Sequence, residues 1–150
     1  QLNRSENGEN QIQRWLLDKR LEAPADFNPA KAPQLADYQN NGASLEQRAR
    51  AYLDANCAHC HNPHGPASTS GLFLEATQTD LLRLGVLKPP VAAGRGSGKR
   101  KYSIVPGKPK ESILLYRMEQ NDPGIRMPEL GRQMAHEEGL ALIREWIQRM

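Results

Sequence analysis

The segment Ser44–His61, which reads SLEQRARAYLDANCAHCH, contains the strongest structural signal in the chain and both of its cysteines. Ser44 is a preferred helix N-cap residue, and Gln47 three positions later completes the pattern of a capping box. Apolar residues then recur at helical spacing, which predicts a helix from about Leu45 to Asn56. This predicted helix ends directly on the segment Cys57–His61, CAHCH.

The Cys57–His61 segment has the Cys-x-x-Cys-His spacing that is typical of c-type heme attachment. Two thiols three residues apart can each form a thioether to one heme vinyl group. The adjacent His61 can then turn its imidazole towards the iron. The position of the motif at the end of a capped amphipathic helix strengthens this interpretation. The pattern therefore predicts one covalent heme c, held by Cys57 and Cys60, with His61 as an iron ligand.

Two other chemistries fit a close pair of cysteines. A thioredoxin-like redox pair normally opens a helix, where the helix dipole lowers the thiol pKa, whereas here the predicted helix precedes the motif. Zinc binding is the minor alternative, because a structural zinc site usually draws its ligands from two separated knuckles. The histidines that such a site could use are His59, His61, His64 and the distant His136.

The rest of the chain predicts a mostly α protein, because no convincing alternating strand is present. Further helices are expected within residues 9–21, at 79–84, between Pro109 and Asp122, and at 136–148. Residues 1–8 are polar and are expected to be loose, and residues 22–43 are expected to be irregular. The predicted organisation is an N-terminal extension or linker over residues 1–43, with a short amphipathic helix, followed by a folded domain over 44–150.

Composition and net charge exclude some classes of function. A length of 150 residues predicts one domain with a modest core. Only 38% of the residues are hydrophobic and 5% aromatic, so a large apolar cofactor could fill the centre of the domain. A net charge of +3 is too small to indicate nucleic-acid binding, but it suits a weak encounter with an acidic partner protein. No apolar run approaches the length of a membrane span, and no signal peptide begins at Gln1, so we expect a mature or trimmed soluble product.

Residues 44–150 resemble a class I cytochrome c domain. The features that carry the resemblance are the capped helix, the Cys-x-x-Cys-His motif, the irregular middle, a Met-Pro loop and a terminal amphipathic helix. Shorter segments are similar to C-terminal heme domains of secreted bacterial cytochromes, namely residues 55–63, 105–107, 112–118, 126–128 and 145–147. This resemblance implies a cytochrome c-like fold with helices around one heme, and a preceding module in a larger chain.

The resemblance also implies a sixth iron ligand, commonly a methionine in a late loop. Met127 matches, because Pro128 follows it and would stiffen the loop. Arg126 is the expected contact of a heme propionate, because it is adjacent to Met127. A backbone carbonyl from residues 66–72 is expected to accept the His61 N–H and orient the ring. The competing sixth ligands are Met134, Met118, Met150 and His136.

With His61 and Met127 on the iron, both axial positions would be filled, so the resemblance implies outer-sphere electron transfer. The chain would then be an electron carrier rather than an enzyme, alone or as the module of a larger redox protein, and it would act with a redox partner protein. There are two alternatives. One is a heme enzyme or gas sensor with an open sixth position, and the other is a zinc-binding interaction module. Covalent heme attachment in bacteria belongs to the periplasmic side of the membrane, which implies a periplasmic or secreted protein.

Overall fold

The computed structural model describes residues 5–6 and 8–150, and the chain divides into two compact units, Gln1–Ala36 and Asp37–Met150. Helices dominate the regular structure of the described residues, which confirms the predicted mostly α class. The domain boundary expected between residues 43 and 44 stays a prediction. None of the described helices is both long and apolar enough to cross a bilayer.

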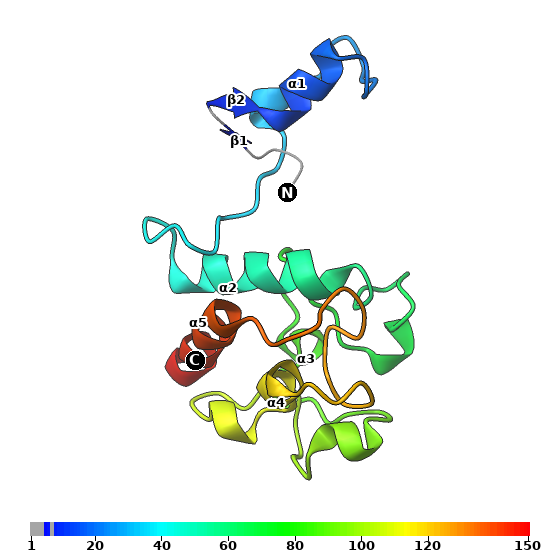
Figure 1. Cartoon of the computed structure of the whole chain (residues 1–150), viewed down its shortest axis with the longest axis vertical. Coiled ribbons are helices and arrows are strands. Elements are labelled where there is room, and N and C mark those ends of the chain that lie inside the picture. The colour runs from blue at the N-terminus through cyan, green and yellow to red at the C-terminus, as the bar shows by residue number, and fades with distance from the viewer. Residues whose placement is uncertain (1–4, 7) are drawn as a thin grey trace. The chain divides into compact units, whose positions relative to one another are not determined.

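The described residues of the first unit form two short strands and one α-helix (Figure 1). Strands β1 (Ser5–Glu6) and β2 (Glu9–Asn10) pair antiparallel, so the expectation of a loose segment is wrong for Ser5–Glu6. Helix α1 (Gln11–Leu17) confirms the helix expected within residues 9–21. It begins there because the Asn10 side chain caps it, accepting a hydrogen bond from the Gln13 N–H at 3.0 Å.

The second unit contains the remaining α-helices of the described chain, and the other predicted helices are all found in it. These are α2 (Leu45–Leu53), α3 (Leu81–Leu84), α4 (Ile113–Glu119) and α5 (Glu137–Arg149). Short 3-10 turns occur at Pro29–Lys31 in the first unit and at Ser68–Ser70, Gly94–Ser97 and Pro109–Glu111 in the second.

The N-terminus of α2 carries the predicted capping box. Ser44 Oγ accepts from the Gln47 N–H at 3.2 Å, and Gln47 Oε1 accepts from the Ser44 N–H at 3.0 Å. At its other end the α-helix stops at Leu53, earlier than predicted, but the winding continues as a π-helical segment, Asp54–Ala58. Such segments are frequent at functional sites. The extended winding brings the chain to Cys57 without a break.

The core of the second unit forms where α5 packs against α2 and α4 (Figure 1). Leu53 of α2 and Ile143 and Ile147 of α5 are fully buried, as expected for the apolar stripe of an amphipathic helix. Glycine at position 139 lets α5 approach α2 closely, because a Cβ there would lie 2.1 Å from the Tyr52 hydroxyl. This contact fixes one end of α5, beside which the candidate site lies.

Candidate functional site

The Cys57–His61 motif lies on the last turn that continues α2. The N–H groups of Cys60 and His61 both donate to the Cys57 carbonyl, at 3.1 and 2.9 Å. This tight turn keeps the two thiols and the imidazole close to one another on a rigid helical support. Both cysteines are half-buried free thiols.

The loop after the motif folds back onto it. The Ala67 N–H donates to the Cys60 carbonyl at 3.1 Å, and the Leu74 N–H donates to the His61 carbonyl at 2.9 Å. Gly65 is required at the closest approach, because a Cβ there would lie 2.3 Å from the Cys60 carbonyl oxygen. The backbone of the motif is therefore held from both sides, by α2 before it and by this loop after it.

The His61 ring is oriented by the same loop. The imidazole hydrogen-bonds to the backbone of Leu72, which confirms the expected acceptor within residues 66–72, and Nδ1 lies 3.5 Å from Ser70 Oγ. Burial lowers the pKa of His61, and the nearby positive charge of Arg117 lowers it further. His61 is therefore neutral at neutral pH, the form in which an imidazole binds a metal.

The pKa of the Cys57 thiol is shifted in the opposite direction from that of an activated redox cysteine. Burial raises its pKa to about 12, and the neighbouring Cys60 contributes in the same direction. A reactive thiol of the thioredoxin type needs a lowered pKa, usually at a helix N-terminus, and Cys57 lies at the C-terminal end of the helical winding. These features oppose the redox-pair alternative.

A cavity of about 330 Å³ opens beside the motif. One wall comes from α2 and the π-helical segment, and the other from α4, α5 and the loop between them. The lining includes Cys57 on the first wall and Met127 on the second, but Cys60, His61 and Arg126 are not among the lining residues. The full lining is Tyr52, Ala55, Asn56, Cys57, His59, Met118, Met127, Pro128, Leu130, Gly131, Arg132, Met134, His136 and Leu140.

The methionines that line the cavity differ in burial. Met127 is half-buried, Met118 is 5% exposed within the core, as predicted for a packing residue, and Met134 is 74% exposed. The backbone of Met127 is fixed, since its N–H donates to the Arg117 carbonyl at 3.0 Å and its carbonyl accepts from Arg132 at 2.7 Å. A half-buried thioether on a fixed backbone suits a ligand better than an exposed one.

Sequence reasoning missed two features of this wall. His136, one of the competing sixth ligands, is exposed at the N-cap of α5 but also lines the cavity, and its Nδ1 is hydrogen-bonded to the Tyr52 hydroxyl at 3.1 Å. The two rings also stack, with centroids 5.7 Å apart. The Arg132 guanidinium binds several backbone carbonyls there. The Tyr52–His136 contact joins positions 84 apart and the Arg132–Met118 contact positions 14 apart, so no local motif predicts them.

Arg126, the expected propionate contact, is half-buried close to the cavity wall. Its charge is one cause of the lowered pKa of Arg132, after burial, so the two guanidiniums lie near each other. Within the described residues, the buried Nε atoms of Arg126 and Arg132 have no hydrogen-bond partner. The buried Nε atoms of Arg48 and Arg50 share this property, and the Nη atoms of Arg132 already donate to backbone carbonyls, so an unpartnered Nε does not by itself mark an anion site here.

The described residues contain no group of three or more His, Cys, Asp or Glu side chains gathered as a metal site. Comparisons with family models, with curated proteins and with solved structures gave no match for this chain.

Proposed function

We propose that residues 44–150 form a monoheme c-type cytochrome domain with a cytochrome c-like fold, and that the chain carries single electrons. The observation that carries this proposal is a juxtaposition. A Cys-x-x-Cys-His motif ends a rigid helical winding, and the cavity beside it has Cys57 on one wall and the half-buried Met127 on the other. In this proposal Cys57 and Cys60 anchor the heme, and His61 and Met127 are its axial ligands.

Cys57 and Met127 line the cavity and suit such a group, and Cys60 and His61 lie next to it in the same motif, outside the lining. The thiols are free, the His61 imidazole is held neutral by burial and oriented by the Leu72 backbone, and the lining is mainly apolar. Arg126, adjacent to Met127 in the sequence, is the proposed contact of an anionic propionate. When bound, a heme supplies a one-electron iron couple. A neutral thioether ligand and an apolar wall both favour the less charged, reduced state.

The same proposal extends to location and partners. A covalent heme of this type implies a periplasmic or secreted protein that exchanges electrons with a redox partner protein. The excess of 20 basic over 17 acidic residues favours an acidic partner surface. Residues 1–43 would then connect this domain to a preceding module of a larger chain.

Covalent attachment is tested by expressing the chain together with bacterial heme-attachment machinery. We expect a heme-stained band on a denaturing gel and a pyridine hemochrome spectrum of heme c, both lost in the Cys57→Ser/Cys60→Ser variant. A protein with only the bare polypeptide mass would exclude this function and favour a zinc-binding or interaction module.

The sixth ligand is tested by spectroscopy of the loaded protein. We expect a weak thioether–iron charge-transfer band in the ferric wild type, lost in Met127→Ala and retained in the control Met134→Ala. A high-spin ferric spectrum of the wild type would instead favour an open sixth position, as in a heme enzyme or gas sensor. Loss of the band in Met134→Ala but not in Met127→Ala would reassign the ligand.

A further inference from the structure

Met127 lies in the middle of the segment between α4 and α5, residues 120–136. No described residue of this segment belongs to a helix or strand. A thioether that is to stay on an iron must nevertheless keep a fixed position, because it is a neutral and readily displaced ligand. The position of Met127 therefore depends on side chains that bind the backbone of this segment.

Arg132 is the side chain that makes these contacts. Its Nη1 donates to the carbonyls of Met118 and Met127, both at 2.7 Å, and its Nη2 donates to the carbonyl of Gln120. Met118 and Gln120 lie at the C-terminal end of α4, where the last carbonyls lack partners within the helix. One guanidinium thus connects the end of α4 to the carbonyl of Met127.

The other polar group of the Met127 backbone is also tied to α4. The Met127 N–H donates to the Arg117 carbonyl at 3.0 Å, and Arg117 Nε donates to the Ile125 carbonyl at 2.8 Å. Both polar groups of the Met127 backbone are therefore hydrogen-bonded: the N–H to a main-chain carbonyl and the carbonyl to the Arg132 side chain. Of these two, only the Arg132 contact can be removed by a substitution that leaves the backbone intact.

A role in surface electrostatics explains Arg132 poorly. No ion pair found among the described residues involves it, and its side chain lines the cavity. Burial lowers its pKa, so keeping a cation at this site has a cost that the carbonyl contacts offset. A lysine could not replace these contacts, because the ammonium group lacks the planar fork with which a guanidinium bridges separated acceptors.

We propose that Arg132 is a positioning residue for Met127: by bridging the Met127 carbonyl to the carbonyls of Met118 and Gln120, it holds the thioether in place as the sixth ligand. This inference rests on the proposed heme function and deepens it. Arg132 acts through Met127 and not through the iron. Its removal therefore weakens the methionine ligand but leaves covalent attachment unchanged.

The test uses the full chain with heme attached, in wild type, Arg132→Lys and Arg132→Gln. The matched control is Arg144→Lys, because Arg144 contacts the same end of α4 through an exposed ion pair with Glu119 at 3.0 Å. We expect unchanged heme content in all four proteins. In the two Arg132 variants we expect a weaker charge-transfer band and at least about tenfold tighter binding of added imidazole, since bonds from a charged donor are lost.

A double-mutant comparison separates positioning from general destabilisation. In the Met127→Ala background, where imidazole meets no competing thioether, adding Arg132→Lys should leave imidazole affinity unchanged. An affinity change of equal size in both backgrounds would overturn the positioning role. So would wild-type band strength and imidazole affinity in Arg132→Lys with heme attached. A wild type without covalent heme would overturn the proposed function, and this inference with it.

Discussion

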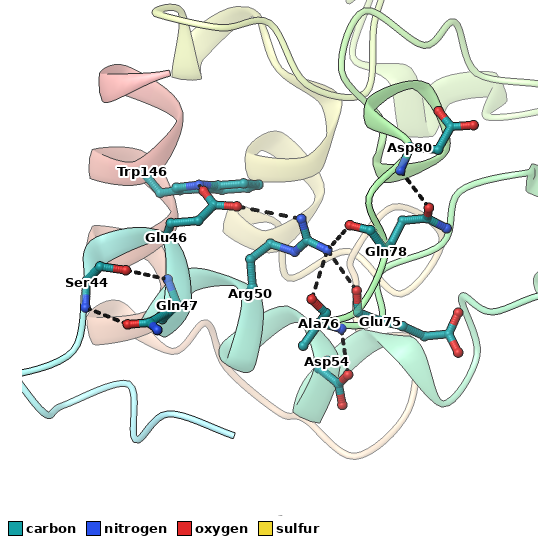
Figure 2. A network of polar contacts seen from close by, with 10 residues as sticks. All are labelled: Ser44, Glu46, Gln47, Arg50, Asp54, Glu75, Ala76, Gln78, Asp80 and Trp146. Atoms are coloured by element: carbon teal, nitrogen blue, oxygen red, sulfur yellow. Dashed lines mark hydrogen bonds and ion pairs between the residues drawn. The ribbon is translucent and has the colours of Figure 1, made fainter. Parts of the chain in front are cut away.

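Arg50 is a buried cation that joins three segments of the second unit (Figure 2). Its side chain points from α2 to the chain at residues 75–78, where Nη2 donates to three backbone carbonyls at 2.5–3.2 Å. Its Nη1 lies 3.6 Å from Glu46, which in turn accepts from the indole of Trp146 on α5. Arg50 is 8% exposed, the residues that supply the three carbonyls are half-buried, and the Glu46 side chain is exposed.

We expect Arg50→Ala to lower the free energy of unfolding by about 2 kcal/mol, because it leaves three half-buried carbonyls without their charged donor. Urea denaturation measures this. The control is Arg83→Ala, which removes an exposed pair with Asp80 at 3.6 Å and should cost less than about 1 kcal/mol. Equal losses in the two variants would show that the Arg50 contacts contribute no more than a surface pair.

The buried phenol of Tyr52 should make the stability of the heme-free chain depend on pH. Burial raises its pKa from 10.0 to about 12. A raised pKa means that the stability contributed by the neutral phenol is complete below pH 10 and is lost as the pH rises through about 12. Phenylalanine at this position cannot titrate.

We therefore expect Tyr52→Phe to be about 1 kcal/mol less stable than wild type at pH 7, because the hydroxyl bond to His136 is lost. The two stabilities should converge as the pH rises from 10 towards 12. Chemical denaturation of the two heme-free chains at a series of pH values checks this. A stability difference that stays constant with pH would contradict the burial argument.

At the scale of elements, the α2–α5 contact depends on a missing side chain. A Cβ at residue 139 would lie 2.1 Å from the Tyr52 hydroxyl and 2.2 Å from its ring carbon Cζ, so one of the two helices would have to move. Gly139 lies inside α5, where alanine would otherwise be the better helix former by about 1 kcal/mol. Close packing and helix propensity therefore predict opposite signs for the same substitution.

We expect packing to dominate, so that Gly139→Ala lowers the free energy of unfolding by about 1–3 kcal/mol, the usual cost of overpacking. In a Tyr52→Ala background the same change should be neutral or stabilising, because the clashing ring is absent. Thermal or urea unfolding of the four proteins gives the comparison. A stabilising Gly139→Ala in the wild-type background would show that the helices separate at little cost.

At the scale of the whole molecule, the two units differ in how much core they contain. Among the described residues, the buried apolar side chains lie almost entirely in Asp37–Met150, with Ile12 the one member from the first unit. Helices α2 to α5, the cavity and the Cys57–His61 motif also belong to the second unit. A unit with its own core is expected to fold independently.

We therefore expect a truncated chain, residues 37–150, to unfold cooperatively and to differ from the full chain by less than about 1 kcal/mol. It should also accept covalent heme to the same extent. Circular dichroism during urea denaturation, with a heme stain of both proteins, tests these points. Loss of cooperative unfolding on truncation would place the first unit within the fold of the second.

By itself, the sequence determined the helices of this protein and the local geometry of its motif. Local signals depend on residues only a few positions apart, so they can be recognised in the sequence. These signals are the Ser44 cap, the apolar stripe of residues 136–148 and the spacing within Cys57–His61. Met127 was singled out differently, by the resemblance to a class I cytochrome c domain, in which a methionine followed by proline matches the sixth ligand. Its role as an iron ligand stays a prediction.

Only the tertiary structure decided which side chains share the cavity. Tyr52 meets His136 across 84 positions of sequence, and Arg132 reaches back 14 positions to Met118. Such contacts depend on how α2, α4 and α5 pack, and the packing is set by buried surfaces that no short pattern contains. The physical reason is that helix signals come from bonds within one or two turns, whereas a cavity wall is assembled from segments that meet only when the core forms.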